Sequence, residues 1–262
     1  MIKEVEVLNS GSPLGDGGKI RVGAVSYLNT KPLVYGFRQG MMADSIELIE
    51  EYPSKVAKML VDDEIDIGLV PVAVIPFLKE YHIVSDYGIA CDGDVASVCL
   101  FSDVPLEEIK TILLDYQSRS SVALLKVLLK EQWKITPELI AAEAGYENTI
   151  KGTTAGLVIG DRALQQRLKN KYIYDLGQGW KELTGLPFVF AAWISNKKLP
   201  ADFINEFNKA NDFGLQKLAE VIKENPYVYY DLHKYYTENI KFKPQFDKLA
   251  VITLFLEKLK SI

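Results

Sequence analysis

Short apolar runs alternate with amphipathic, helix-forming stretches from residue 20 onward, and this alternation constrains the fold more than any other feature of the chain. The predicted order is strand, helix, strand, helix, strand, helix, over Ile20–Val25, Thr30–Arg38, Ile46–Glu50, Pro53–Val61, Asp66–Val70 and Val72–Tyr81. A chain that alternates in this way builds a parallel sheet with helices on both faces. The sequence therefore predicts an α/β fold.

The same alternation resumes after two further predicted strands, His82–Ile89 and Val95–Phe101. The later predicted elements are, in order, Thr111–Leu114, Ser120–Glu131, Leu139–Glu143, Ala155–Ile159, Asp161–Leu168, Tyr172–Leu176 and the strand Phe188–Ser195, with helices from Ala201 to the end. No linker rich in proline or glycine separates the two series, which predicts two lobes joined by strands. We expect a flexible leader at 1–18, a first lobe at 19–101 plus 190–262, and a second lobe at 102–189.

Composition excludes several classes of function. The net charge of −5 and the pI near 5.3 argue against nucleic-acid binding, which needs a concentrated basic surface. The two cysteines, Cys91 and Cys99, are too few for a disulfide framework and are expected to be buried. Motifs for zinc proteases, P-loops, dinucleotide binding and serine hydrolases are absent from the sequence, so neither metal nor cofactor is expected.

The first residues of the chain also indicate in which cellular compartment the protein is expected. They are polar and rich in glycine, without the basic start and apolar stretch of a secretory signal. No apolar run approaches the length that spans a membrane. We expect a cytoplasmic protein without a membrane partner, and the sequence leaves a homodimer open.

The residues after the first predicted strand are candidates for ligand binding, because open α/β sheets bind ligands beyond the carboxyl ends of their strands. Ser26, Asn29 and Thr30 bring small polar side chains to the start of a predicted helix. This combination suits an anion or a hydroxylated ligand. Simple helix capping by Asn29 or Thr30 is the alternative.

A second candidate site follows the strand Thr111–Leu114. Ser118, Arg119, Ser120 and Ser121 place hydroxyls, backbone amides and a guanidinium at a predicted helix start. This is the strongest purely chemical signal for a carboxylate site in the chain. The alternative is an N-cap with a solvated arginine.

Three further features carry weaker signals. Ser97 is a polar residue in a predicted apolar strand, where a serine often only bonds backbone. Asp161 follows the strand Ala155–Ile159 and is predicted to cap the next helix, while also lying where a ligand would bind. The late tyrosines are expected to pack between helices with their hydroxyls at the surface: Tyr227, Tyr229, Tyr230, Tyr235 and Tyr236.

Taken together, the motifs resemble those of one known family. They are VGAVSYLNTKPL at 22–33, DIGLVP at 66–71, CDG at 91–93 with Ser97, SRSS at 118–121, LVIGD at 157–161 and WKELTGLPFVF at 180–190. In this order they resemble the chorismate dehydratases of the futalosine route to menaquinone. The resemblance extends from about residue 19 to the C-terminus and does not include the leader.

The resemblance implies a two-lobed fold like that of type II periplasmic binding proteins, with the ligand cleft between the lobes. It implies chorismate as the substrate, 3-[(1-carboxyvinyl)oxy]benzoate as the product, and Asn29 and Ser97 as active-site residues. Two alternatives stay open. One is a non-catalytic module of the same fold that binds small anions, and the other is the sister lyase that forms a dihydroxynaphthoate, whose Ser-Pro-Cys-Pro-Asn-Asp-Thr-like opening this chain lacks.

Overall fold

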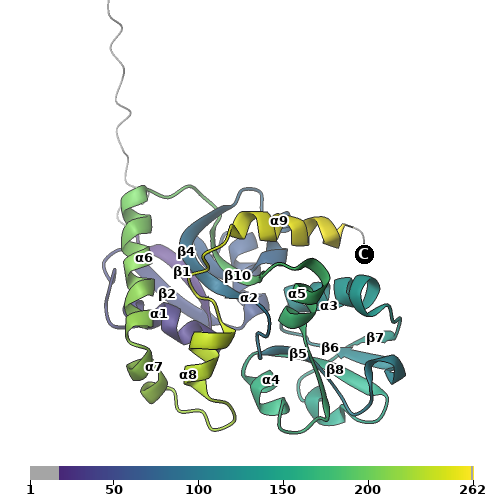
Figure 1. The fold of residues 1–262 in the computed structure, drawn as a ribbon. Helices are drawn as coiled ribbons and strands as arrows, with labels where there is room; N and C mark the ends of the chain where they lie inside the picture. Colours follow the sequence, from purple (N-terminus) through teal and green to yellow (C-terminus); the bar gives the residue numbers. More distant parts are fainter. Residues whose placement is uncertain (1–17, 261) are drawn as a thin grey trace, which may run out of the picture.

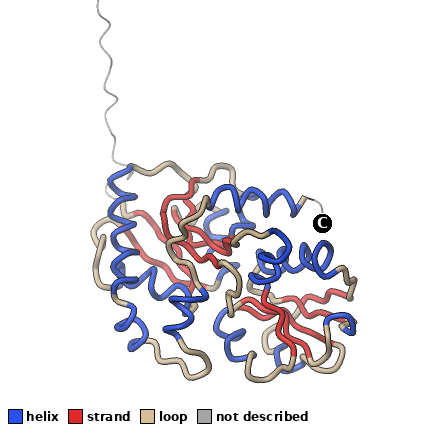
Figure 2. The backbone as a smooth tube through the Cα atoms, viewed as in Figure 1, coloured by secondary structure: helices blue, strands red, loops and turns tan. Residues whose placement is uncertain are grey.

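The computed structural model describes residues 18–260 and 262, so the predicted leader, apart from residue 18, lies outside the described residues. The described chain folds into two α/β lobes, each built on one five-stranded sheet (Figure 1). Figure 2 shows the two sheets as separate groups of strands with helices around each. This architecture confirms the predicted fold class.

The first sheet has the strand order β2-β1-β3-β10-β4. Its strands are β1 (Ile20–Val25), β2 (Ile46–Glu51), β3 (Ile67–Pro71), β4 (His82–Cys91) and β10 (Phe188–Ser195). Strand β1 runs parallel to β2 and β3, whereas β10 runs antiparallel to β3 and β4. The sheet is therefore mixed rather than purely parallel, because β10 enters it from the other lobe.

The second sheet has the strand order β7-β6-β8-β5-β9. Its strands are β5 (Val98–Ser102), β6 (Thr111–Leu114), β7 (Glu138–Ala141), β8 (Thr154–Ile159) and β9 (Tyr172–Asp175). Strand β6 is parallel to both its neighbours, and β5 is antiparallel to both of its own. In each sheet the antiparallel strand is the one that begins directly after the chain has crossed between lobes.

The α-helices are α1 (Lys31–Arg38), α2 (Pro53–Val61), α3 (Arg119–Val127), α4 (Gly160–Gln166), α5 (Leu176–Thr184), α6 (Ala201–Gln216), α7 (Leu218–Glu224), α8 (Leu232–Lys234) and α9 (Lys248–Leu259). Short 3-10 turns lie at Leu28–Thr30, Val72–Phe77, Leu106–Glu108 and Tyr146–Thr149, and π-helical turns at Leu128–Trp133 and Tyr235–Asn239.

Helix α1 packs so closely on α6 that one position requires glycine. A Cβ atom added to Gly36 would lie 2.2 Å from the carbonyl oxygen of Ala210. Close packing of the two helices also buries Phe37 against Phe207, with ring centroids 4.8 Å apart. This contact fixes α1, and with it the 3-10 turn that precedes α1 at the cleft.

The chain crosses between the sheets twice, once between β4 and β5 and once between α5 and β10. Residues 98–101 belong to the second sheet and 188–189 to the first, although the boundaries expected from sequence place them the other way round. We therefore propose that the lobes meet at these crossings, near residues 92–97 and 185–187. Helix α9 then lies against both β10 and α3, and Lys258 pairs with Glu131 at 2.5 Å.

Two predicted elements differ from the structure. The helix expected at Val72–Tyr81 is a 3-10 turn that ends at Phe77, because Pro76 has no amide hydrogen to continue a helix. The strand expected from Val95 begins only at Val98. The reason lies at Ala96, whose φ of 64° cannot belong to a strand.

Candidate active site

A cavity lies between the two lobes. Both sheets contribute to its wall, mostly through apolar side chains, which are Val25, Pro53, Pro71, Ile89, Val98, Ile159, Phe190 and Ala191. The polar contributors are Tyr27 and Asn29 from the first lobe, and Ser118, Ser120 and Ser121 from the second. The cavity therefore forms at strand ends from both lobes, where the sequence predicted the ligand cleft.

The segment after β1 brings Asn29 to the cavity, as expected, but not its two polar neighbours. Asn29 is partly buried in the cavity wall. Thr30 is fully buried and makes no capping bond; its hydroxyl donates instead to Oδ1 of Asn29 at 3.3 Å. Ser26 is exposed and does not line the cavity. Thr30 thus orients the Asn29 amide.

The start of α3 lines the opposite side of the cavity. The hydroxyl of Ser118 accepts the backbone N–H of Ser121 at 3.1 Å, so Ser118 caps the helix and lines the cavity at once. The hydroxyl of Ser120 accepts the backbone N–H of Ala73, from the other lobe, at 3.0 Å. The hydroxyl of Ser120 keeps its own proton to donate, and the positive end of the helix dipole faces the same space.

The structure places Arg119 away from this cavity. Its exposed side chain lines an open groove with Ser54, Tyr116 and Lys126, and this groove shares Ser118 with the cavity. Successive residues of a helix point in directions about 100° apart, so Arg119 and Ser120 cannot face the same space. The hydroxyls of the predicted site meet the cavity, and its guanidinium does not.

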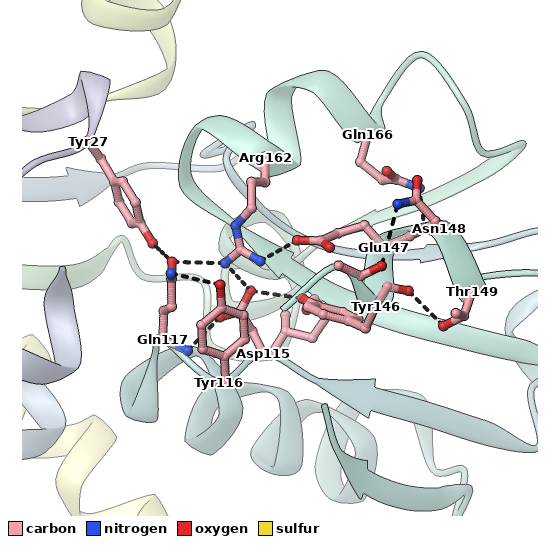
Figure 3. A network of polar contacts seen from close by, with 12 residues as sticks. Tyr27, Asp115, Tyr116, Gln117, Tyr146, Glu147, Asn148, Thr149, Arg162 and Gln166 are labelled. Atoms are coloured by element: carbon pink, nitrogen blue, oxygen red, sulfur yellow. Dashed lines mark hydrogen bonds and ion pairs between the residues drawn. The ribbon is translucent and has the colours of Figure 1, made fainter. Parts of the chain in front are cut away.

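A second guanidinium, that of Arg162, is linked to the cavity wall by hydrogen bonds, although no role was predicted for it from the sequence. Arg162 donates to Asp115 at 2.7 Å and to Gln117 at 3.0 Å, and also pairs with Glu147 (Figure 3). Gln117 in turn accepts the hydroxyl of Tyr27, which reaches across from the first lobe (Figure 3). Arg162 is thus committed to a buried network that ends at the Tyr27 side of the cavity.

Asp161 does not cap α4, which begins one residue earlier at Gly160. Its carboxylate accepts the backbone N–H of Leu28 from the first lobe at 3.0 Å, and its carbonyl accepts the hydroxyl of Tyr227 at 2.5 Å. Burial raises the pKa of Asp161 to about 6, against the lowering effect of the Leu28 N–H. Asp161 therefore links the lobes across the cleft rather than capping a helix.

Ser97 lies at the crossing into β5 rather than within a strand. Asp175, the N-cap of α5, accepts the backbone N–H groups of Val95 at 3.1 Å and Ala96 at 2.7 Å. This clamp holds Ala96 at its positive φ, a conformation that L-residues adopt only when their surroundings impose it. Burial raises the pKa of Asp175 to about 6. Ser97 follows directly and is fully buried just behind the cavity wall at Val98.

Tyr235 contacts one of the two predicted catalytic residues. Its hydroxyl hydrogen-bonds Oγ of Ser97 at 2.7 Å. Burial raises the pKa of this phenol well above its ordinary value, and Ser97 and Asn29 act to lower it. The prediction from sequence that this hydroxyl lies at the surface is wrong, because Tyr235 has no exposed surface. The contact between Tyr235 and Ser97 follows from burial, because a buried hydroxyl needs a hydrogen-bond partner. Burial depends on the tertiary structure, so the sequence alone did not indicate this contact.

Residues 18–260 and 262 contain no group of three or more histidine, cysteine, aspartate or glutamate side chains placed to hold a metal ion. None of their helices is long and apolar enough to cross a membrane. Cys91 and Cys99 are both free and buried, which confirms the prediction from sequence.

Comparison with known families decides where the chain belongs. A family model described as menaquinone biosynthesis matches residues 20–261. The chain belongs to the menaquinone biosynthesis family. Two chorismate dehydratases are similar to it and confirm the resemblance seen in the motifs. A chorismate dehydratase of Thermus thermophilus is 28% identical over 222 residues, which cover 76% of this chain and 79% of that protein.

The second named relative is a chorismate dehydratase of Campylobacter jejuni, 30% identical over 195 residues, which cover 71% of this chain and 73% of that protein. Solved structures with the same fold include a protein from Archaeoglobus fulgidus, with a TM-score of 0.70, 16% identity and coverage of 93% and 96% of the two chains. The periplasmic aliphatic sulphonate binding protein of Escherichia coli has a TM-score of 0.60, 15% identity and coverage of 93% and 91%. This member of the menaquinone biosynthesis family therefore has a periplasmic-binding-protein fold.

Proposed function

We propose that this protein is a chorismate dehydratase, which removes water from chorismate to give 3-[(1-carboxyvinyl)oxy]benzoate in the futalosine route. Membership of the menaquinone biosynthesis family and the names of its two relatives support this function. The observation that carries the proposal is the position of Asn29 in the wall of the interlobe cavity, with Ser97 buried behind that wall next to Val98.

The wall of the cavity suits the substrate. Its apolar side chains from both lobes match the faces of a flat unsaturated ring. Chorismate carries two carboxylates, and the hydroxyls of Ser120 and Ser121 at the start of α3 offer donors for one of them, whereas Ser118 donates its own proton to Oγ of Ser121 at 2.9 Å. Asn29 on the opposite wall offers amide hydrogens to the second carboxylate or to the departing hydroxyl.

The remaining predicted binding residues act indirectly in this proposal. Thr30 orients the amide of Asn29, and Asp161 holds the backbone of Leu28 so that the turn carrying Asn29 keeps its place. Ser26 and Arg119 lie outside the cavity wall, and we assign them no contact with bound chorismate.

The reaction needs little from the protein beyond orientation. The hydroxide leaves one ring carbon and a proton leaves its neighbour, so that the two together make the water lost and the ring becomes aromatic. The aromatic product supplies the thermodynamic drive, and closure of the lobes positions the breaking bonds and excludes solvent.

The cavity wall contains no carboxylate, imidazole or amine among the described residues, so we propose that the substrate's own carboxylate takes the ring proton. Ser97, behind the wall, would donate a hydrogen bond in the same region or relay that proton. The base and the leaving group would then both belong to the substrate, with the protein holding them in place.

The test is to incubate the purified protein with chorismate and to follow the product by mass spectrometry. We expect a product lighter than chorismate by one water, with the absorbance of a substituted benzoate. Recovery of unchanged chorismate, with its binding detected by calorimetry, would instead support a binding module, because the fold serves both functions. Turnover of a cyclic futalosine derivative in place of chorismate would support the sister lyase.

A further inference from the structure

The side chain of Tyr27 reaches from the first lobe to the second, where both its hydroxyl and its ring make contacts (Figure 3). Tyr27 follows β1 and lines the cavity. Its ring lies against Gly160, at the start of α4, so closely that a Cβ atom added to that glycine would lie 2.8 Å from two ring carbons. The second lobe therefore accommodates this ring because residue 160 has no side chain.

The hydrogen bond of the Tyr27 hydroxyl has a defined direction. Nη2 of Arg162 donates to Oε1 of Gln117 at 3.0 Å, and because a guanidinium can only donate, this atom of the amide must be the oxygen. The Tyr27 hydroxyl meets the same oxygen, so it donates its proton there. The amide nitrogen of Gln117 donates instead to the hydroxyl of Tyr116 at 3.0 Å. The bond therefore joins a donor of the first lobe to an acceptor of the second.

Gln117 is itself held within the second lobe. Its backbone N–H donates to Oδ1 of Asp115 at 2.8 Å. Arg162, which donates to its side chain, also donates to Oδ2 of Asp115 at 2.7 Å and pairs with Glu147. The side chain of Asp115 has no exposed surface, so this network is tied into the interior of the lobe. The acceptor of the Tyr27 proton is therefore fixed relative to the second lobe.

The main chain of Tyr27 connects this contact to Asn29. The carbonyl of Tyr27 accepts the N–H of Thr30 at 3.0 Å and so closes the 3-10 turn Leu28–Thr30. Asn29 is the middle residue of that turn and lines the cavity, and the hydroxyls at the start of α3 line it from the second lobe. A contact that fixes Tyr27 against the second lobe therefore also sets how far Asn29 lies from those hydroxyls.

We propose that Tyr27 is a positioning residue that completes the substrate site when the lobes close. Its hydroxyl joins the first lobe to Gln117, and its ring, lying against Gly160, completes the cavity wall where the lobes meet. Both contacts are lost together when the lobes separate, and the site then divides into two halves. This proposal rests on the proposed function and deepens it, because it names a residue that encloses chorismate between the lobes.

The variant Tyr27→Phe removes the hydroxyl and keeps the ring. Its matched control is Tyr87→Phe, because the hydroxyl of Tyr87 also donates to a side chain, Oδ1 of Asp212 at 2.5 Å, but within the first lobe. Spin labels on Lys223→Cys and Lys169→Cys report lobe closure. Both positions are exposed; the first belongs to α7 of the first lobe and the second follows α4 of the second lobe (Figure 1).

The distance between the labels measures the ratio of closed to open protein without substrate. Loss of the interlobe hydrogen bond should lower this ratio about five- to tenfold in Tyr27→Phe, whereas Tyr87→Phe should keep it within about twofold of the wild type. Equal distance distributions in the wild type and Tyr27→Phe, whether both closed or both open, would overturn the proposal. An equal change in the two tyrosine variants would overturn it as well.

The variant Gln117→Leu tests the partner of the hydroxyl, because leucine offers no acceptor. If Tyr27 stabilises closure through Gln117, then adding Tyr27→Phe to Gln117→Leu should lower the ratio of closed to open protein no further. A further fivefold fall in that background would show that the hydroxyl acts through another group, and would overturn the proposal.

Turnover of chorismate separates this proposal from the proposed function. Because only the closed protein holds the complete site, KM in Tyr27→Phe should rise by the factor by which the closed fraction falls, with kcat within about threefold of the wild type. An unchanged KM beside a reduced closed fraction would refute the role in completing the site. If the wild type leaves chorismate unchanged, the proposed function fails, and the label distances still decide whether Tyr27 closes the lobes.

Discussion

Replacing Asp161 with asparagine tests whether the lobes are closed in solution as they are in the structure. The carboxylate of Asp161 meets the Leu28 N–H only when the lobes are together, and burial there raises its pKa from 3.8 to about 6. An asparagine at the same place offers an amide oxygen to the same N–H but cannot titrate. The free energy of unfolding of the wild type, minus that of the variant, is therefore a function of pH that reports the titration of Asp161 alone.

The sign follows from proton binding. Between pH 4 and pH 6 the folded protein holds a proton on Asp161 that the unfolded chain releases, so wild-type stability rises as pH falls through 6. The gain is complete below the ordinary carboxyl pKa of 3.8 and is absent above about pH 7. Each pKa unit corresponds to about 1.4 kcal/mol, so the wild type should gain about 1–2 kcal/mol over Asp161→Asn between pH 7 and pH 5.

Urea unfolding followed by tryptophan fluorescence at pH 7, 6 and 5 measures this difference. Asp175 also has a raised pKa, but it is present in both proteins, so its contribution to the pH dependence of stability cancels in the difference. Asp44→Asn, at an exposed turn, is the control for a general effect of charge. A difference between wild type and Asp161→Asn that stays constant from pH 7 to pH 5 would mean that Asp161 is solvated and the lobes stand apart.

Three other substitutions have defined outcomes. Asn29→Ala should lower kcat about 100-fold or more while the melting temperature stays near that of the wild type, because the side chain is only partly buried in the cavity wall. Tyr146→Phe should destabilise the fold by about 1–3 kcal/mol in urea unfolding, since it removes the single hydroxyl proton that buried Asp115 and the carbonyl of Leu157 share. Gly36→Ala should cost about 1–3 kcal/mol in the same assay, because its Cβ would overlap the backbone of Ala210; an unchanged midpoint would show that α1 and α6 stand further apart.

Local signals in the sequence were enough for much of the fold. The apolar run of β3 predicted a strand buried on both faces, and all five of its residues are buried. Ser118 followed a strand and preceded an amphipathic stretch, and it caps α3 as that pattern indicates. These predictions are confirmed because each depends only on residues that are close together in the sequence.

The active-site region also contains features that local signals could not give. The sequence placed Arg119 with three serines in a predicted carboxylate site and Asp161 at a helix N-cap, but Arg119 lines a different groove and Asp161 meets the other lobe. Which face of a helix meets a cleft depends on how the lobes pack against each other. That packing is determined by contacts between residues that are far apart in the sequence.

What the sequence by itself determined is the alternation of strands and helices, the cleft at the strand ends, and the membership of the menaquinone biosynthesis family that its ordered motifs indicated. What only the tertiary structure decided is how distant polar groups meet. Tyr235 lies 138 residues from Ser97 in the chain, yet their oxygens are 2.7 Å apart. A buried hydroxyl must find a partner wherever the fold provides one, and no local pattern specifies which residue that partner will be.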